Sequence, residues 1–132
     1  MSEKIFEGGT NSIILEILVF TLGGVCYGLV EMIFRGYTHW SMVLTGGACI
    51  LTFYLLDEWL SAFPLVVAAL MGAAIITLYE LCVGLIVNVG LKLDVWDYSG
   101  VAGNFMGQIC PAYTVAWFVL SFIFLGILRV IS

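Results

Sequence analysis

Four predominantly apolar stretches fill most of this 132-residue chain, over about residues 13–34, 41–56, 60–91 and 103–131. A membrane-spanning helix needs about 20 mostly apolar residues, so stretches of this kind predict helices that cross a bilayer. The second stretch is short for a full span, whereas the third is long enough to tilt. The sequence therefore predicts an all-α membrane protein: a four-helix transmembrane bundle that forms one domain over residues 1–132.

The composition excludes the main soluble classes. Hydrophobic residues make up 63% of the chain and charged residues 10%, and the mean hydropathy is +1.17. Soluble domains are about half apolar and about one quarter charged, so this chain cannot cover a water-facing surface. The formal net charge of −5 also argues against binding to nucleic-acid phosphates or to anionic lipid headgroups. We expect a multi-pass protein of the cell membrane.

The positive charges do not decide which way the chain crosses the membrane. With four spans, Lys4 and Arg129 lie on one side, and Arg35 and Lys92 lie on the other. Because cytoplasmic loops carry the excess of Lys and Arg, a tie of two against two leaves the orientation open.

The first and third stretches resemble each other at a constant offset of 49 residues. Residues spaced by four, three and four share one face of a helix, and both stretches have this spacing. The matched pairs are Gly24 with Ala73, Gly28 with Thr77, Glu31 with Glu80, and Arg35 with Gly84. This pattern favours two copies of a two-helix unit, related by an axis along the membrane normal.

Glu31 and Glu80 are ionisable residues at bilayer depth, and a charge there costs roughly 3 kcal/mol on insertion scales. Each lies on a small-residue face, where a side chain can point into the bundle. Arg35 follows Glu31 by one turn, so the two could simply neutralise each other near an interface. Glu80 has no basic residue one turn away. We therefore expect its partner to come from another helix, or its carboxyl group to be protonated.

His39 and Trp40 lie between the first two stretches. A single histidine beside aromatic residues fits an interfacial belt as well as a ligand contact, and both readings stay open. The four cysteines fall one in each stretch with no Cys-x-x-Cys spacing, which supports neither a disulfide framework nor a zinc site. We expect no metal and no cofactor.

The segment from Trp96 to Pro111 is the most informative part of the sequence. Asp97 or Ser99 could cap the fourth helix, and Asn104 and Gln108 would share one face of it. Pro111 lacks an N–H group, which predicts a kink or break in that helix. Broken helices at membrane depth often line a wet cavity that binds ligand. The alternative is a packing kink, with the amide side chains joining helices.

These residues also carry a family resemblance. Residues 35–42 (RGYTHWSM) and 46–49 (GGAC), then 96–99 (WDYS), 107–110 (GQIC), Asn104 and Trp117, resemble the family known as "putative ABC-transporter type IV". Glu80 before Gly84 and Asn88 also fits. The resemblance covers nearly the whole chain. It implies a small polytopic bacterial membrane protein, common in Gram-positive species, with no established substrate.

We interpret the polar and aromatic residues as one ligand-binding site for a small cation or a polar amphiphile, with carboxylate protonation driving exchange. We expect a homo-oligomer, most simply a dimer. No catalytic motif and no nucleotide-binding motif is present, so we expect no enzyme. One alternative is a non-catalytic membrane subunit of a larger complex of the ABC type, and another is an intramembrane lipid-modifying enzyme. The candidate site residues are Glu31, Arg35, His39, Trp40, Glu80, Trp96, Asp97, Tyr98, Asn104 and Gln108.

Overall fold

The structure is a computed structural model that describes residues 9–131, and for residues 9–11, 34 and 35 it describes the backbone alone. The chain forms two compact units, Met1–Ala62 and Phe63–Ser132. Among the described residues, regular structure is helical apart from a single bridge between Phe105 and Ile109. Lys4 and the side chain of Arg35 lie outside the described part.

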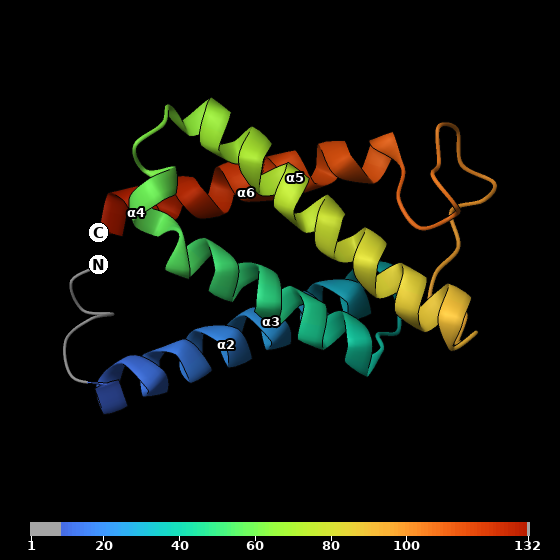
Figure 1. The fold of residues 1–132 in the computed structure, drawn as a ribbon, viewed down its shortest axis with the longest axis horizontal. Coiled ribbons are helices and arrows are strands. Elements are labelled where there is room, and N and C mark those ends of the chain that lie inside the picture. Colours follow the sequence, from blue (N-terminus) through green and yellow to red (C-terminus); the bar gives the residue numbers. More distant parts are fainter. Residues whose placement is uncertain (1–8, 132) are drawn as a thin grey trace. The chain divides into compact units, whose positions relative to one another are not determined.

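Unit 1 is a pair of helices, α2 (Gly9–Arg35) and α3 (Trp40–Leu55), followed by the single turn α4 (Asp57–Leu60). Helices α2 and α3 lie side by side (Figure 1). Glycines allow their backbones to approach closely. A Cβ atom on Gly46 would lie 2.6 Å from Tyr27 Cβ, and one on Gly47 would lie 2.7 Å from the carbonyl oxygen of Phe20. The small-residue positions are therefore the packing face of this helix pair.

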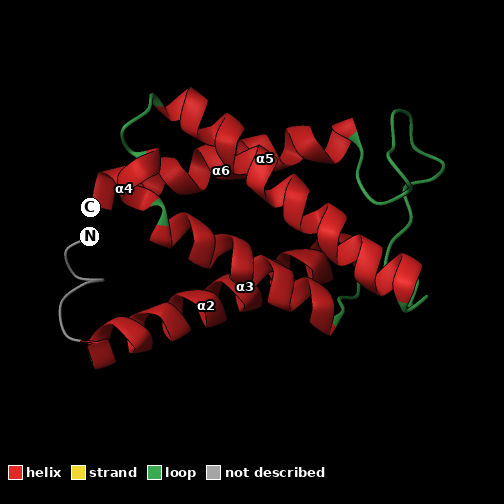
Figure 2. Ribbon diagram, viewed as in Figure 1, coloured by secondary structure: helices red, strands yellow, loops and turns green. Residues whose placement is uncertain are grey.

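Unit 2 is also a helix pair. Helix α5 (Leu65–Gly84) continues directly into a π-helical segment, η1 (Leu85–Gly90), and residues 91–110 then lead to α6 (Pro111–Ile131) (Figure 2). Helices α5 and α6 run antiparallel. An Arg129 nitrogen donates to the carbonyl oxygen of Phe63 over 2.6 Å, and the hydroxyls of Thr77 and Thr114 are 3.1 Å apart. Each unit is thus a two-helix unit, whereas a repeat relation between the two stays a prediction.

The prediction that the fourth helix spans residues 103–131 with an internal kink is wrong. Residues 103–110 form turns, and the helix begins at Pro111. Proline suits the first position of a helix, because the N–H group it lacks has no intrahelical partner there. Gly103 and Gly107 have φ angles of +74° and +73°, and Met106 has a φ of +55°. A right-handed helix cannot pass through these positions, so Pro111 starts α6 rather than bending it.

Three of the described helical segments are long and apolar enough to cross a membrane: Ser12–Ile33, Leu65–Gly90 and Pro111–Ile131. The fourth predicted span, α3, is an apolar helix of only 16 residues. Large apolar side chains on these helices are exposed, such as Leu22, Leu78 and Val115. Exposed apolar surface on this scale marks a membrane-facing protein. The chain is an all-helical membrane protein. Of the four predicted spans, three are long enough to cross a membrane in the described residues.

Candidate functional site

Glu80 is the buried acidic residue of unit 2, with 3% of its surface exposed. The Tyr98 hydroxyl donates to Glu80 Oε2 over 3.1 Å, and the Trp117 indole Nε1–H donates to Oε1 over 3.4 Å. Tyr98 belongs to the segment 91–110 and Trp117 to α6, so three parts of unit 2 meet at this carboxyl group. Both of these donors are neutral groups.

Aromatic rings continue from these two donors. Tyr98 stacks on Tyr113 with ring centroids 4.7 Å apart and an interplanar angle of 11°. Tyr113 is in turn tilted against Trp117, at 6.2 Å and 39°. Tyr113 was not among the predicted site residues, and Trp117 was marked only through the family resemblance. The signal that could have found them is their spacing of four, which places both rings on one face of α6.

Helix α6 begins at the level of Glu80. The hydroxyls of Thr77 on α5 and Thr114 on α6 are in contact, so these two residues lie at the same level. Because the helices are antiparallel, three residues forward along α5 to Glu80 and three residues back along α6 to Pro111 reach the same new level. Beyond Glu80 the span continues for ten residues to Gly90, which is about 15 Å along its axis. Residues 91–110 therefore pack beside the last turns of α5 and η1, where a longer α6 would otherwise lie.

Asn88 and Gln108 hold this segment against the span. Asn88 Nδ2 donates to Gln108 Oε1 over 2.8 Å, and Asn88 Oδ1 accepts from the Val95 backbone N–H over 2.7 Å. Gln108 Nε2 donates to the Met106 carbonyl, and the Gln108 carbonyl accepts from the Trp96 indole N–H over 2.9 Å. The predicted residues Trp96 and Gln108 are thus brought together, with Asn88 joining them.

Asn104 and Asp97 shape turns within the same segment. Asn104 Oδ1 accepts from the Gly107 N–H over 3.0 Å, and its Nδ2 donates to the Val101 carbonyl over 2.9 Å. Asp97 Oδ1 accepts from the Ser99 N–H over 2.9 Å. The prediction that Asp97 or Ser99 caps the fourth helix is wrong because that helix begins at Pro111. The prediction that Asn104 and Gln108 share a helical face is wrong because neither residue is helical.

The Asp97 turn should depend on pH. Hydrogen bonds from the Ser99 hydroxyl, and then from the Ser99 backbone N–H, hold the pKa of Asp97 below its ordinary value of 3.8. A depressed pKa means that the ionised form stabilises the folded turn above pH 3.8, and that this stabilisation is lost as the pH falls through the folded pKa. We expect Asp97→Asn to speed amide exchange at Ser99 near neutral pH. Below that pKa the two proteins should exchange alike, whereas a constant difference at every pH would contradict the assignment.

The remaining predicted residues lie in unit 1. His39 is the N-cap of α3: its Nδ1 accepts from the Ser41 N–H over 3.2 Å and lies 2.7 Å from Ser41 Oγ. The Trp40 side chain is exposed beside the His39 ring, and Glu31 on α2 is buried. The Glu31–Arg35 ion pair stays a prediction because the Arg35 side chain is outside the described residues. The predicted site therefore divides into a group in each unit.

Replacing His39 tests its capping role. His39→Ala removes the acceptor for the Ser41 N–H, and we expect a loss of about 1 kcal/mol in the free energy of unfolding. His39→Asn should restore most of this loss, since asparagine is a favoured N-cap residue. Denaturant titration of the purified protein in detergent micelles measures both variants. Equal losses for alanine and asparagine would show that the ring acts in some other way.

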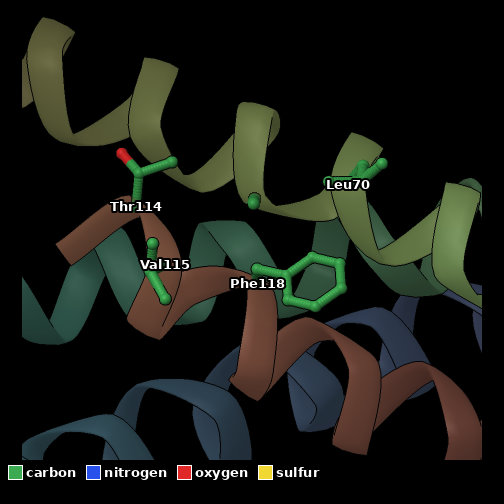
Figure 3. Close-up of a pocket in the computed structure, with 5 residues that line it drawn as sticks. Leu70, Thr114, Val115 and Phe118 are labelled. Atoms are coloured by element: carbon green, nitrogen blue, oxygen red, sulfur yellow. The ribbon is translucent and has the colours of Figure 1, made fainter. Parts of the chain in front are cut away.

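A separate hollow of about 280 Å³ lies between α5 and α6 (Figure 3). It is lined by Leu70, Ala73, Thr114, Val115 and Phe118, and by none of the predicted site residues. No group of three or more His, Cys, Asp or Glu residues that could hold a metal occurs in the described part of the chain.

The fold and the surroundings of Glu80 define a helical membrane protein with a buried carboxyl group held by aromatic donors. Residues 18–132 match the model of the family described as "Putative ABC-transporter type IV", and the chain belongs to that family. The resemblance seen in the sequence is thereby confirmed. No curated protein and no solved structure matches the chain.

Proposed function

We propose that this protein is a membrane-embedded component of a transport system and that it binds a small cation, or the cationic head of a polar amphiphile, at Glu80. The family name supports a role related to ABC-type transport. One observation carries the specific proposal: a carboxyl group with 3% exposure, within a membrane-spanning segment, hydrogen-bonded by the neutral donors of Tyr98 and Trp117.

The energetics favour a cation as ligand. An ionised carboxylate at bilayer depth is costly unless a positive charge compensates it. A bound cation supplies that compensation, and aromatic ring faces such as those of Tyr98, Tyr113 and Trp117 attract cations. Protonation of Glu80 removes the negative charge of the site and releases the cation. Cation exchange therefore depends on the protonation state of Glu80. Asn88, Trp96, Asp97, Asn104 and Gln108 position the segment that carries Tyr98.

The transport system contains more than this chain. The sequence holds no Walker motif, so a partner ATPase supplies ATP hydrolysis if the system is of the ABC type. We propose a homodimer in the cell membrane, in which Glu31, His39 and Trp40 of unit 1 form a second polar group. Its carboxylate occupies the position that matches Glu80 in the proposed repeat.

Calorimetric titration of the protein in lipid nanodiscs tests the cation site. The probes are the chlorides of ammonium, methylammonium and choline, with 3,3-dimethylbutan-1-ol as the neutral isostere of choline. At least one cation should bind while the isostere does not. Glu80→Gln should weaken that binding at least about tenfold, which corresponds to about 1.4 kcal/mol.

Glu16→Gln is the matched control, because it makes the same carboxyl-to-amide change on α2 and should leave cation binding unchanged. Cation binding that survives in a folded Glu80→Gln variant would overturn the assignment.

A non-catalytic subunit is the second candidate. It is favoured by the use of Asn88, Gln108 and Asn104 in hydrogen bonds that build the segment 91–110. In that case the polar residues stabilise the helix pair, and Glu80→Gln would disturb assembly with a partner while no cation bound to the wild-type protein. The same titrations, combined with size-exclusion profiles of the two variants, separate these functions.

A further inference from the structure

The two spanning helices of unit 2 end at different levels. Leu65–Gly90 has 26 residues and is about 39 Å long, whereas the hydrocarbon core of a bilayer is about 30 Å thick. Helix α6 begins about 15 Å before the level of Gly90. The last turns of the longer span remain apolar, and Ile86 and Val89 on them are exposed. These turns need a lipid environment, and residues 91–110 lie beside them.

The segment 91–110 itself exposes large apolar side chains. Phe105 is 53% exposed and Met106 is 58% exposed, and Leu91, Leu93 and Val101 are exposed as well. Leu91 and Leu93 lie next to η1, where they alternate with the exposed Lys92 and Asp94, and the other three lie in the second half of the segment, before α6. The stretch Asp97–Gly100 between them is polar apart from Tyr98. In water, exposed apolar side chains of this size would be unfavourable.

The backbone of the segment is hydrogen-bonded internally at many positions. The Tyr98 N–H donates to the Gly107 carbonyl over 2.8 Å, and the Phe105 N–H donates to the Ile109 carbonyl over 2.9 Å. Side chains add to the pattern, since Asn88 accepts from the Val95 N–H and Asn104 from the Gly107 N–H. Lipid-exposed irregular backbone does not occur within the hydrocarbon region, so a segment bonded in this way belongs at the boundary with the headgroups, from which its apolar side chains can reach the acyl chains.

We infer that residues 91–110 form a membrane-embedded segment whose apolar ends contact lipid at the boundary between headgroups and acyl chains. Leu91, Leu93, Phe105 and Met106 face the acyl chains, continuing the lipid-facing surface of η1 and α6. Lys92 can extend its ammonium group to the headgroups from this depth. The occupant of this surface is therefore the bilayer, rather than a second protein.

Photolabelling of the wild-type chain tests this inference. The protein is reconstituted into vesicles of phosphatidylcholine and phosphatidylglycerol, and labelled either with a lipid that carries a diazirine on its acyl chain or with a water-soluble diazirine. Mass spectrometry then gives the ratio of lipid to aqueous labelling at each residue. Val119 and Ile123, exposed on α6, provide the lipid standard, and Glu58, exposed on α4, provides the aqueous standard.

We expect Phe105 and Met106 to show the labelling ratio of Val119 and Ile123, and Gly100 to show the ratio of Glu58. Aqueous labelling of Phe105 and Met106 at the level of Glu58 would overturn the inference. Protection of both residues from both reagents would also overturn it, because it would mean that protein covers them. Met106→Ser should lower lipid labelling at position 106 and leave the labelling of Phe105 unchanged. That result would show that the segment stays at the same depth in the membrane.

Discussion

Gly47→Leu is expected to separate α2 from α3 and to cost about 3 kcal/mol in the free energy of unfolding. A Cβ atom on Gly47 would lie 2.7 Å from the carbonyl oxygen of Phe20, which is a backbone atom of α2. A flexible side chain could turn away from such a contact, but a backbone atom moves only if the helix moves. Denaturant titration in micelles, followed by circular dichroism, measures the loss.

The matched pair Gly47→Ala and Gly126→Ala separates packing from helix propensity. Both changes place alanine in a helix, which by itself favours the folded state by about 1 kcal/mol. A Cβ atom on Gly126 would meet Leu65 at 3.6 Å, an ordinary contact, so Gly126→Ala should be neutral or stabilising. Gly47→Ala should be destabilising. The same sign for both variants would show that α2 and α3 do not approach as closely as described.

Asn88→Leu should cost about 3 kcal/mol in the free energy of unfolding, because it removes three hydrogen bonds. The Val95 and Trp96 N–H groups lose their bonds to Asn88 Oδ1 and Gln108 Oε1 loses a donor, while the volume of the side chain is nearly kept. We expect the damage to centre on residues 91–110. Hydrogen exchange should therefore rise at Val95 before it rises in α6.

A double-mutant cycle with Gln108→Leu provides the control. The two residues share one hydrogen bond of 2.8 Å, so the double variant should lose less than the sum of the two single losses. The same cycle between Asn88→Leu and His39→Ala joins sites in different units with no shared hydrogen bond among those described, and should be additive. Additive losses for Asn88 and Gln108 would contradict the network.

The helices could largely be predicted because hydropathy and length decide which segments cross a membrane. The errors have local causes. Pro111 fits both a kinked helix and a helix start, and the choice depends on the left-handed backbone at Gly103, Met106 and Gly107. Glycine can adopt that conformation without requiring it, so the composition of the segment does not decide between the two. The stretch that forms α3 could be recognised as short, but it was still counted as a membrane span.

Glu80 could be predicted from sequence because a carboxyl group in an apolar helix is rare and costly. Its partners could not, since Tyr98 and Trp117 are 18 and 37 residues away and only the fold brings them to it. The side-chain amides of Asn104 and Gln108 were predicted to matter, but the structure gives them a different role from the predicted one. Asn104 and Gln108 were expected on a helix face, and they hydrogen-bond the turns and the indole of Trp96 instead. Asn88 gave no signal beyond its place in the family resemblance.

Native mass spectrometry of the protein released from nanodiscs, without added ligand, tests whether Glu80 holds a bound cation. We expect wild-type protein and Glu16→Gln to be released as a homo-oligomer that carries a reproducible small mass. Glu80→Gln should form the same oligomer without that mass. The same bound mass on Glu80→Gln, or a wild-type protein that is released as a bare monomer, would contradict a cation site at Glu80.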